Sequence, residues 1–206
     1  MLTFDHMALT CETLEEGVAF VEDALGVPLA SGGKHTHMST HNRVMGMGDL
    51  YFEVISADPS VAPPAWPRWF DMDSFSGRPR ITSWICRSDD LEADVAAFAP
   101  DFTGVPTALT RGDLKWRFAI PPSGKVPFDD AFPSLMQWDC EVTPPMVLPD
   151  SGVRLIRLEI AHPRADDLRA TLAGHLKDDP RVEFVQGSTK AMRGSFSTPH
   201  GVRILE

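Results

Sequence analysis

Cysteine is scarce in this sequence, and its three occurrences, Cys11, Cys86 and Cys140, lie far apart among 206 residues. A disulfide-stapled fold needs an even set of cysteines, and a structural zinc site needs pairs such as Cys-x-x-Cys. The sequence has neither pattern, so it predicts a reduced protein of the cytoplasm. The amino terminus also lacks a basic segment followed by an apolar stretch, and we therefore expect no signal peptide.

Long apolar runs and clusters of positive charge are missing as well. No stretch reaches the roughly 18 apolar residues that a membrane-spanning helix needs. The chain carries 29 acidic and 19 basic residues, a net charge of −10, and its Lys and Arg residues do not cluster. This balance argues against nucleic acid and anionic membranes as partners. An apolar content of 43% is enough for a globular core.

One order of elements, β-α-β-β-β, is predicted three times along the chain. In the first module, residues 1–57, an apolar strand precedes a helix that begins at a capping box of Thr13 and Glu16. Gly26 and Pro28 end this helix. Three further strands are predicted after it, at 28–31, 41–47 and 50–56.

Residues 78–142 form the second predicted module and residues 152–206 the third, with Pro-rich linkers at 58–77 and 143–151. One such module would leave a face of its sheet exposed, so the modules should associate. The competing interpretation is a generic α+β domain without a repeat. The strands predicted in these two modules are 81–86, 107–110, 115–120 and 134–139, followed by 153–161, 182–185, 191–197 and 202–205.

His6 and Glu53 are the first candidates for a functional site, because they lie on the first and the last predicted strand of one module. Side chains alternate along a strand, so Phe4, His6 and Ala8 should share one face, as should Tyr51, Glu53 and Ile55. If both faces line one cleft, the imidazole and the carboxylate can share a divalent metal ion, or Glu53 can act as a general base. The same two residues can equally form a buried hydrogen-bonded pair between strands.

A second group of polar residues competes with this pair. His35, His37 and His41 would face one side of an extended segment, a spacing that can hold a transition metal. Two glycines just before them indicate instead a mobile loop with solvated histidines. His41 and Arg43 are better candidates for the polar wall of a ligand cleft. The Arg43 guanidinium can bind a carboxylate in this role, or it can form a surface salt bridge.

Large apolar side chains near these positions have two interpretations each. Met45 and Trp138 lie on predicted strands, where they either pack in the core or line an apolar pocket. Trp66 and Trp69 lie in the first Pro-rich linker, where they pack against the domain, cover the cleft or form a subunit contact.

The order of these segments resembles a known superfamily. Phe4-Asp5-His6, followed by the helix start at Thr13, is similar to the opening of the vicinal oxygen chelate superfamily. The resemblance implies an α+β fold in which tandem βαβββ modules form a curved, incomplete barrel with a central cleft. Five segments are more narrowly similar to its glyoxalase-like domain family: residues 32–35, 40–43, 50–55, 136–139 and 158–163.

The resemblance also implies a ligand set for a divalent ion, Zn, Mn, Ni or Fe, with no organic cofactor. His6 and Glu53 match the metal ligands of the first module, and Gln137 falls near the glutamate position of the second. Ser83 or a neighbour stands where a second histidine would be expected, so a four-ligand site is incomplete.

Two functions are compatible with this resemblance. One is a metal-assisted lyase or isomerase that acts on a small oxygenated substrate, with Glu53 as the catalytic residue. The other is a metal-free small-molecule-binding protein of the bleomycin-resistance type. In either case His41, Arg43, Met45 and Trp138 are the predicted substrate-binding residues.

The odd number of modules predicts a homodimer, because modules pair in this fold and closed pairs of subunits are the commonest assemblies. Light scattering at micromolar concentration should therefore give twice the chain mass. A monomeric mass would contradict the expectation.

Overall fold

The structure is a computed structural model that describes residues 1–98 and 100–206. The elements of the first module are β1 (Thr3–Thr10), α1 (Leu14–Leu25), β2 (Ala30–His35), β3 (Thr40–Gly46) and β4 (Tyr51–Ala57). Those of the second are β5 (Arg80–Arg87), α2 (Leu91–Ala97), α3 (Pro100–Thr103), β6 (Val105–Arg111), β7 (Leu114–Ile120), α4 (Pro127–Asp130) and β8 (Ser134–Trp138). The third module has β9 (Arg154–His162), α6 (Ala165–Leu172), β10 (Val182–Gln186), β11 (Ala191–Thr198) and β12 (Gly201–Leu205). The linkers contain the short helices η1 (Trp69–Ser74) and α5 (Pro144–Val147).

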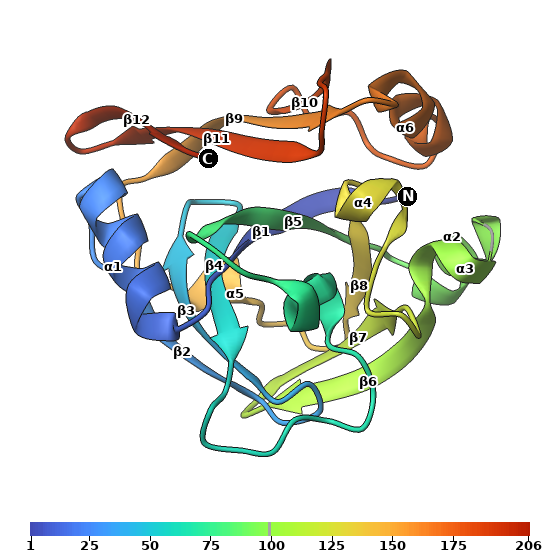
Figure 1. Cartoon of the computed structure of the whole chain (residues 1–206), viewed down its shortest axis with the longest axis horizontal. Coiled ribbons are helices and arrows are strands. Elements are labelled where there is room, and N and C mark those ends of the chain that lie inside the picture. Colours follow the sequence, from blue (N-terminus) through green and yellow to red (C-terminus); the bar gives the residue numbers. More distant parts are fainter. Residues whose placement is uncertain (99) are drawn as a thin grey trace.

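The first two modules build one eight-stranded sheet with the order β2-β3-β4-β1-β5-β8-β7-β6. In each module the first strand pairs in parallel with the last, β1 with β4 and β5 with β8. The two first strands, β1 and β5, join the modules in antiparallel pairing at the centre of the sheet. The sheet curls into a half-barrel (Figure 1). The predicted α+β fold with a curved, incomplete barrel is confirmed.

Helix α1 begins and ends where the sequence predicts. The Thr13 hydroxyl accepts a hydrogen bond from the Glu16 amide at 3.3 Å, which caps the helix start. Gly26 ends the helix in the left-handed conformation with φ of 73°. Within the helix, Gly17 allows close packing, because a Cβ at this position would lie 2.3 Å from the Cys11 sulfur. The helix therefore packs directly against the chain that leaves β1.

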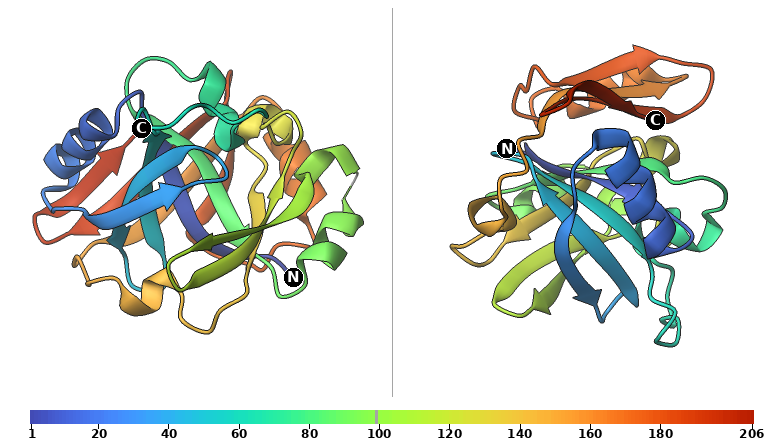
Figure 2. Two further views of the ribbon diagram at one scale, coloured as in Figure 1. Left: turned by 90° about the horizontal axis from the view of Figure 1, so that it is seen from below. Right: turned by 90° about the vertical axis from the view of Figure 1, so that its left-hand side faces the viewer.

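The third module forms a separate sheet, β10-β9-β11-β12, that lies as a layer across the half-barrel (Figures 1 and 2). Its pairing differs from the first two modules, because β9 pairs in parallel with β10, the strand that follows its helix. Aromatic rings join the layers: Phe196 meets Phe52 at 5.9 Å between ring centres, and Phe184 meets Trp84 at the same distance. The third module thus covers the convex face of the half-barrel in its own chain.

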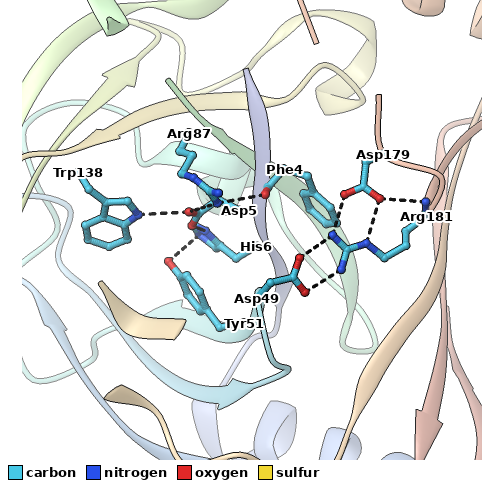
Figure 3. A network of polar contacts seen from close by, with 9 residues as sticks. All are labelled: Phe4, Asp5, His6, Asp49, Tyr51, Arg87, Trp138, Asp179 and Arg181. Carbon is cyan, nitrogen blue, oxygen red and sulfur yellow. Dashed lines mark hydrogen bonds and ion pairs between the residues drawn. The ribbon is translucent and has the colours of Figure 1, made fainter. Parts of the chain in front are cut away.

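Charged groups also hold the third sheet in place. The Arg181 guanidinium, just before β10, pairs with Asp49 in the turn between β3 and β4 at 2.8 Å (Figure 3). Asp179 binds the same guanidinium at 2.8 Å and keeps it oriented. Arg181 is mostly buried from solvent while Asp49 is exposed, so the pair contributes more to position than to stability.

The eight-stranded sheet has a core on each face. The convex core lies between this sheet, the helices and the third sheet, and it includes Phe4, Met7, Phe52, Trp84, Leu158 and Phe196. The concave cluster lies inside the curve and includes Met38, Ile55, Trp69, Ile85, Trp116 and Phe118. Within the part of the chain that the structure describes, no helix is both long and apolar enough to cross a membrane.

Truncation of Phe196 should test whether the third sheet belongs to the same cooperative unit. This side chain is fully buried, so Phe196→Ala should lower the free energy of unfolding by about 3–5 kcal/mol. Val202→Ala is the control, because Val202 on β12 is 63% exposed and its truncation should cost at most about 0.5 kcal/mol. Urea denaturation followed by tryptophan fluorescence and by circular dichroism should give one shared transition. Two separate transitions would show that the layers unfold independently.

Candidate functional site

A pocket opens on the concave side of the half-barrel, and both of its modules contribute to it. The first module contributes polar groups from all four of its strands, and the second contributes aromatic side chains and one arginine. Residues of η1 cover the pocket, so that the cavity encloses only about 30 Å³. The lining residues are His6, His35, Asn42, Tyr51, Glu53, Trp69, Phe70, Arg111, Leu114, Trp116, Phe118, Met136 and Trp138.

An irregularity in β1 decides which side chains reach this pocket. Phe4 pairs with Cys86 and His6 with Ile85, so Asp5 is an extra residue between two consecutive pairs of the ladder. Such a bulge reverses the alternation of side chains along a strand. Phe4 consequently packs in the convex core, 6.0 Å from Trp84 between ring centres, while His6 faces the pocket. The prediction that Phe4 shares a face with His6 is therefore wrong.

The bulge also brings the Asp5 carboxylate beside His6 (Figure 3). Asp5 accepts hydrogen bonds from His6 Nδ1 at 2.7 Å, from the Trp138 indole at 3.2 Å and from Arg87 at 3.3 Å. Burial by itself would raise the pKa of Asp5, but the hydrogen bonds and charges of these neighbours outweigh burial and lower it. An ionised carboxylate can only accept, so His6 carries its proton on Nδ1 and presents an Nε2 lone pair to the pocket.

Tyr51 completes this chain of hydrogen bonds. Its ring stacks on His6 with 4.1 Å between ring centres, and its hydroxyl lies 3.2 Å from His6 Nε2. Burial raises the pKa of Tyr51 well above its usual value, and the charges of Asp5 and Glu53 add to the shift. The phenol therefore stays protonated and donates to His6. Asp5, His6 and Tyr51 form an oriented series that ends at the pocket.

Glu53 faces the same space from β4. One carboxylate oxygen accepts a hydrogen bond from the Asn42 amide at 2.5 Å. The other lies 3.9 Å from His6 Nε2, and the side chain is only 7% exposed. Tyr51 and Ile55, two residues away on either side, also face the concave side, as strand alternation predicts.

The second module adds one positively charged side chain, Arg111, to the polar groups of the pocket. Arg111, at the end of β6, places Nη1 3.3 Å from His35 Nε2 and 3.1 Å from the Asn42 side-chain oxygen. His35 Nδ1 lies 3.0 Å from the Thr40 hydroxyl. Burial lowers the pKa of His35 to about 4; Glu53 opposes this shift and Arg111 adds to it. His35 is therefore neutral near pH 7, and Arg111 supplies the positive charge of the pocket.

These residues do not fit a resident divalent metal ion. Among residues 1–98 and 100–206, no group of three or more His, Cys, Asp or Glu side chains is placed to hold one. His6 and Glu53 supply two donors, but the nearest third, His35, accepts a hydrogen bond from Arg111, whose charge repels a cation. Gln137, the remaining predicted ligand, faces α2 instead and accepts a hydrogen bond from the Leu91 amide at 2.8 Å.

Three predicted substrate-binding residues lie on β3, and the structure directs them away from the pocket. Met45 packs in the convex core, and Arg43 donates to the backbone carbonyls of Leu29 and Ala30 at 3.2 and 3.0 Å. Asn42, between His41 and Arg43, is the residue of this segment that lines the pocket. Successive residues of a strand face opposite sides of the sheet. An error of one position in the expected phase of β3 therefore exchanges the residues that face the pocket with those that face away from it. Trp138, the fourth predicted residue, does line the pocket.

The three histidines proposed as an alternative metal site are separated. His35 is buried on β2, whereas His37 is exposed and stacks on Trp66 at 4.6 Å between ring centres. The glycines before them lie within β2 and serve close strand pairing rather than a mobile loop. A Cβ at Gly32 would lie 2.0 Å from the Asn42 backbone oxygen.

Four polar residues in or beside the pocket, Asp5, Asn42, Tyr51 and Arg111, are not among the site residues predicted from the sequence. Tyr51, the only tyrosine in the chain, lies on the face of Glu53 as strand alternation predicts, but that pattern assigned it no role. Asp5 is adjacent to His6 and would face away without the bulge. Asn42 required the correct alternation of β3. Arg111 belongs to another module, and no local pattern connects it with His6 or Glu53.

Known proteins include a sequence family that matches this chain and solved structures with a similar fold. The sequence model of a family described as glyoxalase-like domain matches residues 4–176. A hypothetical protein from Staphylococcus aureus has a similar structure, with a TM-score of 0.61 and 16% identity over 93% of this chain and 88% of that one. Methylmalonyl-CoA epimerase from Mycobacterium tuberculosis aligns with a TM-score of 0.45 and 13% identity over 66% of this chain and 85% of that one.

The epimerase of Streptomyces coelicolor, in complex with 2-nitronate-propionyl-CoA, aligns with a TM-score of 0.44 and 13% identity. That alignment covers 69% of this chain and 100% of the epimerase. The search of curated protein sequences gave no match.

Burial of His35 predicts a specific acid sensitivity. The folded protein keeps this histidine neutral down to about pH 4, whereas the unfolded chain protonates it near its ordinary pKa of 6.5. Protonation of the unfolded state should thus lower the free energy of unfolding by about 3 kcal/mol as the pH falls from 6.5 to 4. His35→Gln should remove this part of the pH dependence.

The measurement is urea denaturation at several pH values between 4 and 7. His37→Gln, a change at an exposed histidine two positions away, is the matched control and should keep the wild-type slope. Equal slopes for wild type and His35→Gln would refute the assignment.

Proposed function

The chain belongs to the glyoxalase-like domain family of the vicinal oxygen chelate superfamily, and on that premise we propose that it is a lyase or isomerase acting on a small oxygenated acid. The observation that carries the proposal is the convergence of three groups in one pocket. These are the Glu53 carboxylate, the Tyr51 hydroxyl and the Arg111 guanidinium. Together they supply a base, a hydrogen-bond donor and a fixed positive charge.

Arg111 is the proposed binding group for the substrate. Its Nη1 is held by His35 and Asn42, which fixes the plane of the guanidinium. A guanidinium has five N–H groups, and we assign the remaining ones to a carboxylate or to an enolate oxygen. The aromatic walls of the pocket, Trp116 and Trp138, would contact the apolar part of the substrate.

Glu53 is the proposed general base. It would remove a proton from the carbon next to the substrate carbonyl, and the electron pair of that C–H bond would move to the oxygen as an enolate. Arg111 and the Tyr51 hydroxyl would stabilise this negative charge. In an isomerisation, Glu53 returns the proton to the former carbonyl carbon, and the proton of the adjacent substrate hydroxyl moves to the enolate oxygen, so that the carbonyl changes place. In an elimination, a β-substituent departs with its electron pair, and Glu53 releases its proton to solvent.

Asp5 and His6 are positioning residues in this scheme. The lowered pKa of Asp5 keeps it ionised, so it holds His6 in the tautomer whose Nε2 receives the Tyr51 hydroxyl. The hydroxyl is thereby kept at the pocket and can turn its proton toward the enolate oxygen. Asp5 acts through His6, in the way that buried carboxylates orient histidines in other enzymes.

The sequence predicted a metal-assisted reaction, whereas the proposed reaction uses no metal ion. The resemblance of the sequence to the superfamily implied a divalent metal ion held by His6 and Glu53. The donors of this pocket do not fit such an ion, because the nearest third donor, His35, already accepts a hydrogen bond from the positively charged Arg111. Every step above therefore uses side chains of the chain itself.

The second candidate is a metal-free binding protein that holds its ligand without reaction. The cavity limits both candidates alike, since about 30 Å³ accommodates only a few atoms beyond a water molecule. A larger ligand of either kind needs η1 to move. Phe70 and Asp71 of η1 already have left-handed backbone angles, φ of 60° and 50°, which are costly for these residue types.

The proposal also covers the location, the oligomeric state and the partner of the protein. The reduced cysteines support a cytoplasmic location. The homodimer stays a prediction from the sequence, because the third module covers the convex face within one chain and so supplies no reason for a second subunit. The proposed partner is a small molecule.

Exchange of a substrate proton with solvent tests the enzyme proposal. A panel of 2-hydroxy, 2-oxo and 3-hydroxy acids in D₂O should contain at least one compound whose α-proton signal the protein removes in ¹H NMR. Glu53→Gln should slow that exchange by about 10²–10⁴-fold, because it removes the base and keeps the shape. Arg111→Gln should mainly raise KM, and EDTA should leave the rate unchanged.

Arg43→Gln is the matched control, because Arg43 lies on β3 next to Asn42 but binds backbone carbonyls outside the pocket. Its exchange rate should equal that of the wild type. Saturable binding of panel acids without exchange in any of them would favour the binding protein instead. Loss of exchange with EDTA and recovery with added metal would contradict the metal-free mechanism.

A further inference from the structure

A second cavity lies between the two sheets, away from the pocket described above. It is bounded by the start of β5 on the eight-stranded sheet and by β9 and β11 of the third sheet, and its volume is about 440 Å³. That volume is within the roughly 300–1,000 Å³ range of small-molecule sites. The two cavities share no lining residue.

The charge of this cavity is opposite to that of the whole chain. Four basic side chains line it, against two acidic ones, whereas the chain as a whole carries a net charge of −10. A local excess of positive charge with partly apolar walls attracts anions more strongly than the net charge suggests. The basic residues are Arg78, Arg80, Lys190 and Arg193, and the acidic ones are Glu159 and Glu206.

Two of these cations are held in place by the fold. The Arg80 guanidinium donates to the carbonyls of Ser76 and Arg78 at 3.0 and 3.2 Å and lies over the Phe75 ring at 4.2 Å. Lys190 donates to the Thr82 carbonyl at 2.6 Å. An orientation that is already fixed lowers the entropy lost when a ligand binds.

Lys190 carries the strongest indication of a missing ligand. An ammonium group has three N–H donors, and its hydrogen bond to Thr82 uses one. Burial lowers the pKa of Lys190 to about 8; the charge of Arg80 adds to the shift, whereas those of Asp130, Asp129 and Asp71 oppose it. The side chain is therefore still mostly charged at pH 7, and burial of a charge is costly unless it is paired.

Arg193 has a different role, because its charge is already neutralised. It pairs with Glu159 at 3.1 Å and with Glu206 at 3.2 Å. Both acidic residues of the cavity are thus engaged by one arginine. Lys190, Arg78 and Arg80 remain to bind an anion.

The rest of the cavity wall is apolar. Ile81 and Met192 are each only 3% exposed, and Ala161 and Val185 lie beside them. A free inorganic anion would leave this wall uncovered. The composition suits a ligand with an anionic group at one end and an apolar group at the other.

We propose that this cavity is a second binding site, specific for a small organic anion such as a phosphate ester or a carboxylate with an apolar substituent. The anionic group binds Lys190, Arg78 and Arg80, and the apolar part contacts Ile81 and Met192. Because the site joins the third sheet to β5, its occupant also bridges the two layers of the protein.

Methyl NMR of protein labelled at the methionine methyl groups tests this site directly. Met192 lines the second cavity and Met136 lines the first pocket, so the two signals report the two sites separately. Phenyl phosphate and benzoate are the anionic probes, benzyl alcohol is the neutral counterpart, and inorganic phosphate lacks the apolar part. At least one organic anion should shift the Met192 signal in a saturable way, more tightly than inorganic phosphate, and benzyl alcohol should not.

Charge-removing variants decide whether the basic residues cause the binding. Lys190→Met should weaken the organic anion about tenfold or more, the loss of one buried charge contact of about 1.4 kcal/mol. Arg78→Gln, at an exposed position that leaves the fold unaffected, should weaken it about threefold or more. Arg203→Gln on the exposed part of β12 is the control and should bind like the wild type.

Several outcomes would overturn the proposal. They are no saturable shift of Met192 with either organic anion, equal binding of benzyl alcohol, and full affinity in both Arg78→Gln and Lys190→Met. If Lys190→Met does not fold, Arg78→Gln alone decides. A shift confined to Met136 would place the anions in the first pocket, which would support the proposed function but reject the second site.

Discussion

The candidate site depends on one extra residue in the central strand β1. The bulge at Asp5 sends Phe4 into the convex core and His6 into the pocket, although the two residues are only two positions apart on one strand. A regular strand would have placed both on one face. The bulge also puts the Asp5 carboxylate against His6 Nδ1 at 2.7 Å, and this contact sets the direction of the hydrogen bonds that follow through Tyr51. A change of register by one residue is therefore the structural origin of this series of hydrogen bonds.

The third sheet and the eight-stranded sheet have different roles: one covers the convex face, and the other holds the pocket on its concave face. The third sheet covers the convex face, so the aromatic and aliphatic side chains there are buried without a second subunit. The concave face is then free to hold polar groups, and buried polar groups are tolerated only when they are paired. His6, Glu53 and Arg111 each have a partner within the pocket. Their mutual contacts fix the arrangement that a substrate would meet.

Sequence patterns predicted much of this arrangement because they depend on neighbours along the chain. The capping residue Thr13, the terminating Gly26 and the alternation around Glu53 all act within a few positions, and the structure has the helix and strand that they predict. The predictions failed where the phase of a strand was needed, as for His41 and Arg43, whose neighbour Asn42 lines the pocket instead. Gln137 was predicted to be a metal ligand because it occupies a matching position in the second module. In the structure its side-chain oxygen accepts a hydrogen bond from the Leu91 amide at the start of α2 instead.

The amino-acid sequence by itself determined the α+β modules, their order and the two strands that carry His6 and Glu53, because periodicity and capping are local properties. Only the tertiary structure decided the bulge, the entry of Arg111 from the second module and the unsuitability of the pocket for a metal ion. Those features arise from hydrogen-bond register between strands that are distant in the chain. Register depends on the whole sheet, and no short segment of sequence contains it.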